Sequence, residues 1–115
     1  MIKRSEQHSG ILHEVVEHHG VLHIAGTVGD DKKADMETQA RQTFQSIEKL
    51  LNAHGSGKEQ LLTALIFITD MKLKPEMNKA WKAWLAPAHL PTRATIGVAD
   101  LDGWLIEVVV TAAKK

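Results

Sequence analysis

The feature that most constrains the fold is the nine-residue run from Leu61 to Thr69 (LLTALIFIT), which is apolar and β-branched almost throughout. The run is long for a strand and short for a helix, and its Ile, Phe and Thr content favours a strand. Because polar residues do not alternate along it, we expect this strand to be buried on both faces. The chain must therefore build a sheet in which this strand is central.

The residues before this run predict a hairpin and then a helix. Ile11 to Glu17 and Val21 to Ala25 are short β-branched-rich runs, and His18-His19-Gly20 between them suits a tight turn. From Asp35 the apolar spacing changes to three and four residues, which predicts an amphipathic helix that ends before Gly55. Its apolar face consists of Ala40, Phe44, Ile47 and Leu51, and His54 continues the same line.

The residues after this run predict a second helix and two more strands. Pro75 stands where a helix favours its first residue, and apolar residues then repeat at helical spacing until Pro87. Trp81 and Trp84 belong to this repeat and are expected to pack the helix onto the sheet rather than to stack on a ligand. The final runs, 94–99 (ATIGVA) and 104–113 (WLIEVVVTAA), flank Asp102-Gly103, a favoured turn pair, so we expect them to form a hairpin.

The predicted element order is β-β-α-β-α-β-β, and the predicted fold class is α+β. A core of 115 residues is usually undivided, so we expect one domain over 1–115, with 1–10 as a loose N-terminal segment. The crossover from 61–69 through the second helix should be right-handed, and both helices should lie on one face of a mixed sheet. The strands at 61–69 and 104–113 are apolar on both faces, so the other face needs a partner, most simply another copy.

Charge and residue usage exclude several classes of function. Fourteen basic and fourteen acidic residues cancel, which argues against a nucleic-acid partner. The chain has no cysteine, which excludes disulfides, thiolate catalysis and cysteine-bound metal. No apolar run approaches the roughly 18 residues of a membrane span, and the N-terminus lacks the apolar core of a signal peptide. We therefore expect a cytoplasmic protein with no membrane partner.

Two charged residues near the C-terminus are the candidate catalytic pair. Glu107 lies inside an apolar strand, where an ionised carboxylate is costly unless it is paired or hydrated. Taken alone, an edge-strand glutamate or a core ion pair would explain it. Arg93 follows Pro91-Thr92 on the preceding strand. Its rigid, planar guanidinium group can donate paired hydrogen bonds to a carboxylate. Together they indicate a small anion-binding pocket.

The segment around these residues resembles the C-terminal signature of the YjgF/RidA family of reactive intermediate deaminases. Pro-Thr-Arg-Ala-Thr at 91–95 is followed by an apolar strand and then by Leu-Ile-Glu-Val at 105–108. Upstream, the resemblance extends to the first-helix QxRQ segment at 39–42, a strand-ending aspartate at Asp70, and the second-helix Met-Asn-Lys-Ala-Trp at 77–81. The resemblance covers about 11–113. The Met-Asn-Lys-Ala-Trp segment is similar to that of a side branch of small homologues.

The resemblance implies a chorismate-mutase-like fold, a homotrimer, and clefts between subunits that bind a small carboxylate. It further implies hydrolytic deamination of 2-imino or 2-enamino acids, in which Arg93 binds the substrate carboxylate and Glu107 positions or activates water. No metal or organic cofactor is implied. The other residues that the resemblance places around the substrate are Thr95, Asn78, Gly26, Ala25 and Leu12.

Three substitutions relative to the family keep alternatives open. Leu12 stands where the best-known deaminases have a tyrosine, Ala25 where they have a serine, and Thr95 where they have a cysteine. A non-catalytic protein that binds small carboxylates in the same cleft is therefore the main alternative. Endoribonuclease activity or translation inhibition, also attributed to this family, is less consistent with a neutral chain. Chaperone-like binding through exposed apolar surface is neither favoured nor excluded.

Other apparent motifs lack the context that their chemistry needs. His13-Glu14-Val15-Val16-Glu17 resembles the zinc motif HExxH, but its last residue is glutamate and its composition is that of a strand. The histidines of the first hairpin leave only adventitious metal binding open. Gly55-Ser56-Gly57-Lys58 lacks the upstream glycine and the following Ser or Thr of a phosphate loop, so we interpret it as a helix end and loop.

Overall fold

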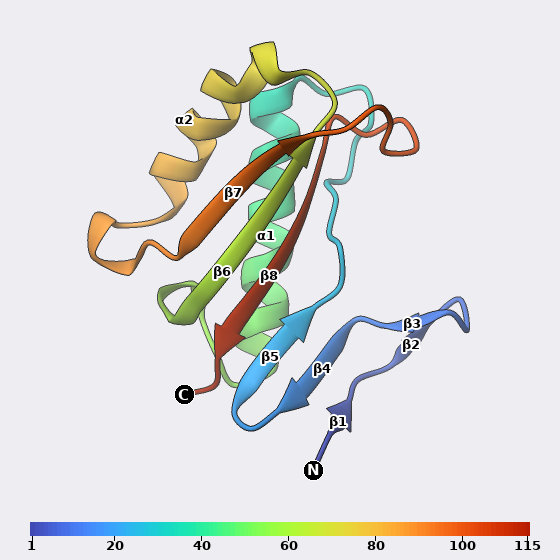
Figure 1. Cartoon of the computed structure of the whole chain (residues 1–115), viewed down its shortest axis with the longest axis vertical. Coiled ribbons are helices and arrows are strands. Elements are labelled where there is room, and N and C mark those ends of the chain that lie inside the picture. Colours follow the sequence, from blue (N-terminus) through green and yellow to red (C-terminus); the bar gives the residue numbers. More distant parts are fainter.

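The computed structural model describes all 115 residues, and Figure 1 shows its sheet with helix α1 behind the strands and α2 beside it. The α+β class and the mixed sheet with two helices on one face are confirmed. The elements in chain order are β1 (Lys3–Arg4), β2 (Gln7–His8), β3 (Leu12–His13), β4 (Val15–His18), β5 (Val21–Ile24), α1 (Met36–Ala53), β6 (Leu61–Ile68), α2 (Lys74–Trp84), β7 (Thr92–Gly97) and β8 (Ile106–Ala113).

Helix α1 begins and ends where the sequence predicts. The Asp35 carboxylate accepts a hydrogen bond of 2.9 Å from the Thr38 backbone N–H, which caps the helix and lowers the pKa of this carboxyl group. Gly55 follows the helix with a φ of 78°, the left-handed conformation in which glycine is favoured. The predicted apolar positions Ala40, Phe44, Ile47 and Leu51 are all fully buried against the sheet.

Helix α2 packs beside α1 through an aromatic cluster. Pro75 lies in its first turn, as predicted. Trp84 stacks on Phe44 of α1 with ring centroids 4.8 Å apart, and Trp81 meets Phe44 edge-on at 5.6 Å. The Trp84 indole N–H also donates a 2.8 Å hydrogen bond to the Glu48 carboxylate. Both tryptophans therefore pack α2 into the core, as expected.

The prediction that the last two strands form a hairpin is wrong. The sheet order is β1-β4-β5-β8-β6-β7, so β6 lies between β7 and β8 and is parallel to the first and antiparallel to the second. Asp102 and Gly103 do adopt positive φ angles of 55° and 90°, but within a loop that carries the chain across the end of β6 (Figure 1). The Asp102-Gly103 pair determines the local bend of the backbone. The strand pairing is decided by β6, because β7 and β8 each pair with one of its two edges and not with each other.

The predicted first strand, 11–17, is interrupted. Glu14 separates β3, which pairs with β2, from β4, which pairs with β5 and β1. The first ten residues, expected to be loose, contain the exposed two-residue strands β1 and β2. The β4–β5 hairpin itself is confirmed, with His19 and Gly20 as a two-residue turn at φ angles of 51° and 75°.

The two faces of the sheet differ in burial. On β6, Ala64, Ile66 and Ile68 are buried under the helices, together with alternate residues of β8. On the opposite face, Leu65 is 41% exposed and Ile96 of β7 is 39% exposed. The prediction that β6 is buried on both faces is therefore wrong for a single chain, and β6 lies next to the edge strand rather than at the sheet centre. Neither helix is long and apolar enough to cross a membrane.

A fully buried glutamine on α1 fixes the entry to β8. The Gln39 amide nitrogen donates to the carbonyls of Lys32 and Ala34 at 3.1 and 3.0 Å, and its oxygen accepts a 3.0 Å hydrogen bond from the Leu105 N–H. The side chain thus joins the loop before α1 to the residue that precedes β8. Although Gln39 belongs to the segment that carries the family resemblance, its spacing alone gave it no structural role.

Gln39→Leu is expected to lower the free energy of unfolding by about 2 kcal/mol, because it removes three hydrogen bonds that the buried Gln39 side chain makes with the backbone. Urea denaturation measures the change. Gln45→Leu, at an exposed position of the same helix, is the matched control and should leave stability nearly unchanged. Equal effects of the two substitutions would contradict the assigned role.

Candidate functional site

Arg93 lies on the edge strand β7 and points toward the helices. Its register partner on β6 is the buried Ala64, so the two side chains share the helix-facing side of the sheet. The guanidinium carbon lies 5.2 Å from the centre of the Trp81 ring, and Nη1 is 3.9 Å from the Met77 sulfur. Burial lowers the pKa of Arg93, and no acidic side chain forms an ion pair with it. The group remains a cation without a counterion.

Two polar side chains near Arg93 also have free hydrogen-bonding atoms. Asn78, on α2, lines with Arg93 and Trp81 a cavity of about 520 Å³. Its Oδ1 atom is buried without a hydrogen-bond partner, and so is Oγ1 of Thr95, two residues beyond Arg93 on β7. Buried polar atoms are usually satisfied, so unpaired atoms on both elements that hold the guanidinium are consistent with a polar ligand here.

Glu107 belongs to a second depression, at the other side of β6. It alternates on β8 with the buried Ile106 and Val108 and therefore points to the face opposite the helices. The depression has a volume of about 800 Å³, and Glu107 lines it together with Leu12, Ala25 and Gly26. These are the remaining residues that the sequence places around the substrate.

Gly26 provides the space that the Glu107 carboxylate occupies. A Cβ atom built on Gly26 would collide with Oε2 of Glu107 and lie 3.1 Å from its Cδ. Thr27, the next residue, exchanges backbone hydrogen bonds of 2.9 Å with Val108 in both directions, so this close approach is fixed by the sheet. Any side chain at position 26 must displace the carboxylate.

If Glu107 positions water, as the resemblance implies, Gly26→Ala should lower kcat by at least about tenfold while leaving the fold intact, because it would move the carboxylate by about 1 Å. Steady-state kinetics with a 2-imino acid, beside a thermal unfolding curve, would measure this. Gly97→Ala is the control, since its Cβ would meet only the flexible end of Met71. Wild-type kcat in the folded Gly26→Ala variant would show that the position of Glu107 is unimportant.

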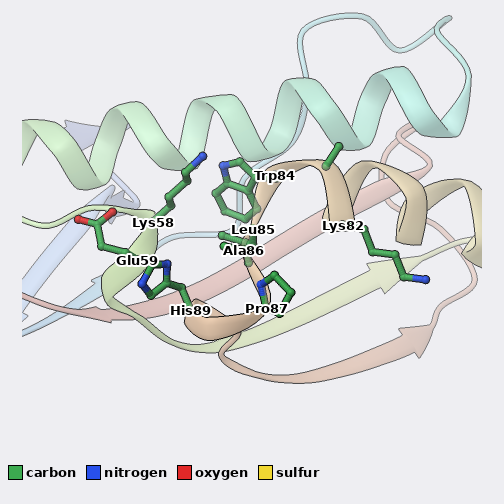
Figure 2. Close-up of a pocket in the computed structure, with 9 residues that line it drawn as sticks. Lys58, Glu59, Lys82, Trp84, Leu85, Ala86, Pro87 and His89 are labelled. Carbon is green, nitrogen blue, oxygen red and sulfur yellow. The ribbon is translucent and has the colours of Figure 1, made fainter.

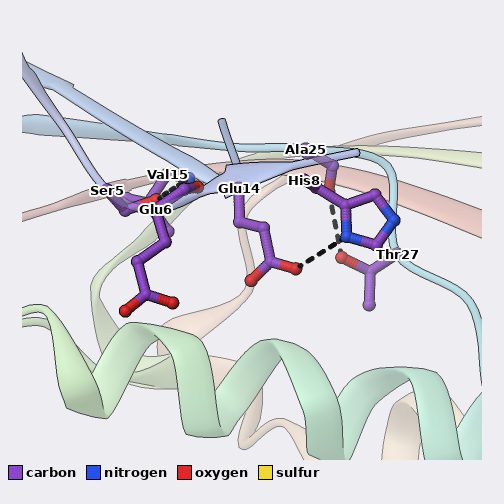
Figure 3. A network of polar contacts seen from close by, with 7 residues as sticks. All are labelled: Ser5, Glu6, His8, Glu14, Val15, Ala25 and Thr27. Atoms are coloured by element: carbon purple, nitrogen blue, oxygen red, sulfur yellow. Dashed lines mark hydrogen bonds and ion pairs between the residues drawn. The ribbon is translucent and has the colours of Figure 1, made fainter. Parts of the chain in front are cut away.

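A polar network secures the N-terminal strands beside this depression. Figure 3 shows His8 directed at Glu14, with 3.7 Å between the imidazole Nδ1 and the carboxylate. The Thr27 hydroxyl donates to the Ala25 carbonyl at 3.0 Å, and the Val15 N–H donates to the Ser5 hydroxyl at 2.9 Å. No group of three or more histidine or acidic side chains is placed to hold a metal ion.

A single chain does not bring Arg93 and Glu107 together. Arg93 pairs with Ala64 and Glu107 with Phe67, and these partners lie three residues apart on the strand between them. An odd separation directs the two side chains to opposite faces of the sheet. Two strand spacings and three residues of rise separate their backbones by about 14 Å. The predicted site is thus two half-sites, one with Arg93, Asn78 and Thr95, the other with Glu107.

Another cavity, of about 540 Å³, lies where α2 meets the loop before β7, and no predicted site residue lines it (Figure 2). Its Lys58 lies 4.0 Å from Glu48, and its Glu59 lies 2.8 Å from Lys115, which lowers the pKa of that carboxyl group. These charges are neutralised within the chain. Lys82, by contrast, extends away from Lys58 and His89 in Figure 2 and also lines the Arg93 cavity.

The fold and the unpaired arginine define a class of small α+β proteins with a six-stranded mixed sheet, two helices and a candidate anion site at the sheet edge. A family model described as Endoribonuclease L-PSP matches residues 5–114. The chain belongs to this family, which includes the RutC and YjgF proteins.

Individual relatives match over nearly their whole length. A RutC family protein of Haemophilus ducreyi is 35% identical over 101 residues, which cover 87% of this chain and 86% of that protein. The RutC family protein YoaB of Escherichia coli is 34% identical, with 87% and 88% covered. Among solved structures, a protein from Pseudomonas aeruginosa superposes with a TM-score of 0.93 at 30% identity, with both chains covered completely. A YjgF family member from Neisseria meningitidis gives 0.92 at 28%, with 100% and 96% covered.

Proposed function

We propose that the protein hydrolyses 2-imino or 2-enamino acids to 2-keto acids and ammonia, and that Arg93 binds the substrate carboxylate. The observation that supports this best is the partly buried guanidinium on Trp81 that lacks an acidic partner. A cation that loses hydration without gaining a counterion favours an anionic ligand. The planar guanidinium group can donate two parallel hydrogen bonds, which favours a carboxylate. Asn78, which lines the same cavity, offers a further polar side chain beside the ligand.

We further propose that the complete site forms between subunits of a homotrimer. The Arg93 and Glu107 half-sites lie on different surfaces of one chain, so a contact that joins them is heterologous, and such a contact makes a ring when its rotation closes. The uncovered sheet face, with Leu65 and Ile96 exposed, and the unpaired edge of β7 provide surface for that contact. Each ring of three would contain three equivalent sites.

The proposed reaction needs little chemistry from the protein. The iminium carbon is already electrophilic, so the site must fix the substrate and hold water about 3 Å from that carbon. Arg93 orients the carboxylate, and Glu107 of the neighbouring subunit accepts a proton from the attacking water. Proton transfer to nitrogen and expulsion of ammonia then give the keto acid. No cofactor takes part in these steps.

The test of this proposal couples the protein to an amino-acid oxidase that generates imines in situ. The protein should accelerate the release of ammonia and keto acid, and it should protect an imine-sensitive reporter enzyme. Heat-denatured protein is the control for imine breakdown in solution. Spontaneous rates of hydrolysis in the presence of folded protein would contradict the deaminase proposal.

A non-catalytic carboxylate-binding protein is the second candidate, and the lining of the Glu107 depression favours it. Leu12 and Ala25, which line it, stand where the best-known deaminases carry a tyrosine and a serine, so two hydroxyl groups beside Glu107 are replaced by apolar side chains. Thermal shift with a panel of 2-keto acids separates the two functions. Stabilisation without turnover would favour the binding protein, and stabilisation with turnover the deaminase.

A further inference from the structure

The α2 face above Arg93 includes a lysine that the sequence analysis did not single out. Asn78, Lys82 and Leu85 follow one another at spacings of four and three residues, so they share one side of the helix. All three line the Arg93 cavity, with Trp81 between them in sequence. The helix therefore places Lys82 on the lining of the same cavity as Arg93.

The charges around this cavity are all of one sign. Its lining contains the cations Lys82 and Arg93 and no acidic residue; the other members are Asn78, Trp81, Leu85, Pro87 and Leu90. Lys82 forms no ion pair, whereas Lys79 on the same helix lies 3.5 Å from Glu37 of α1. Neither cation has an acidic partner within the chain, so an anionic ligand in the cavity can interact favourably with both.

We propose that Lys82 is a specificity-determining residue that makes the site selective for dianionic substrates, namely short 2-imino dicarboxylic acids. Arg93, fixed on Trp81, binds the carboxylate next to the imine carbon. The lysine, on a flexible stem, binds the carboxylate at the other end of the substrate. Such a substrate is supplied either by oxidation of an acidic amino acid at its amino-bearing carbon or by elimination of water from its 3-hydroxy derivative. The choice of 2-imino acids as substrates rests on the proposed function. The preference for a second carboxylate rests on the charges that line the cavity.

Two five-carbon keto acids, which are products of the proposed hydrolysis, test this selectivity. 2-Oxoglutarate carries two carboxylates and 2-oxopentanoate carries one. By isothermal titration calorimetry, the wild-type protein should bind 2-oxoglutarate at least about fivefold more tightly, and this preference should weaken as salt is raised. Lys82→Gln should remove the preference and leave the affinity for 2-oxopentanoate unchanged. Lys82→Arg should restore it.

Lys79→Gln is the matched control, because it removes the same charge from the same helix outside the cavity. It should retain the preference. A preference that survives Lys82→Gln, or that the wild-type protein lacks, would overturn the assignment of Lys82 while leaving the deaminase proposal intact. Failure of both keto acids to bind, or binding that is insensitive to Arg93→Ala, would instead overturn the anion site itself.

Discussion

Arg93→Ala is expected to lower kcat/KM for 2-imino acids by about 30- to 5,000-fold, because truncating one partner of a buried charge pair costs about 2–5 kcal/mol. The loss should appear in both KM and kcat, since the arginine binds the substrate and also orients it. Keto-acid affinity, measured by calorimetry, should fall together with kcat/KM. The Trp81 surface on which the guanidinium lies should remain, so the variant is expected to fold.

Two further variants separate charge from geometry at this position. Arg93→Lys keeps the positive charge but loses the planar fork, and it should recover only part of the activity. Arg41→Ala removes an exposed arginine of α1 that does not line the Arg93 cavity, and it should behave like the wild type. If Arg93→Ala retained wild-type affinity for keto acids, the carboxylate anchor would have to be elsewhere.

Glu107→Gln is expected to lower kcat by about 10²- to 10⁴-fold, the usual contribution of a positioned general base. Because the amide has the same shape as the carboxylate, the contact with Gly26 should persist and KM should change little. Glu14→Gln, in the same depression, is the matched control and should have a small effect. A kcat reduced equally in both variants would show that the charge of the depression matters and that no single base acts.

Mixing the two inactive variants tests where the site lies. If each site takes Arg93 from one subunit and Glu107 from the next, random trimers of Arg93→Ala and Glu107→Gln chains carry both intact residues in roughly one quarter of their sites. Co-expressed chains should therefore regain close to that fraction of wild-type activity. A site within one chain would regain none.

The elements that depend on local sequence were predictable. The apolar spacing of α1, its start after Asp35 and the start of α2 near Pro75 are determined by neighbouring residues, and they lie where the pattern placed them. The resemblance at 91–95 and 105–108 also identified the family correctly. Both the helix patterns and the family signature lie in short segments, so a single sequence is enough to reveal them.

What was mispredicted depends on contacts between distant segments. Asp102-Gly103 has the backbone of a hairpin turn, yet β6, some forty residues earlier, inserts between the strands on either side. Strand order is decided by the whole sheet, so local turn chemistry could not reveal it. Because β6 lies between β7 and β8, the Arg93 and Glu107 side chains point to opposite faces of the sheet. Their spacing along the chain does not indicate this. Lys82 could have been noticed, since it lies four residues after Asn78 on a helix.

The position of Trp81 gives this molecule an internal optical reporter. The chain has three tryptophans and no tyrosine, so its near-ultraviolet emission comes from these indoles alone. Trp84 is stacked on Phe44, and Trp104 lies near Lys32, whereas the Trp81 ring is the one beneath the Arg93 guanidinium. An anion that neutralises that cation changes the electric field across the Trp81 ring. Occupancy of the arginine cavity can therefore be followed by fluorescence in unlabelled protein, with Trp84→Phe and Trp104→Phe reducing the background.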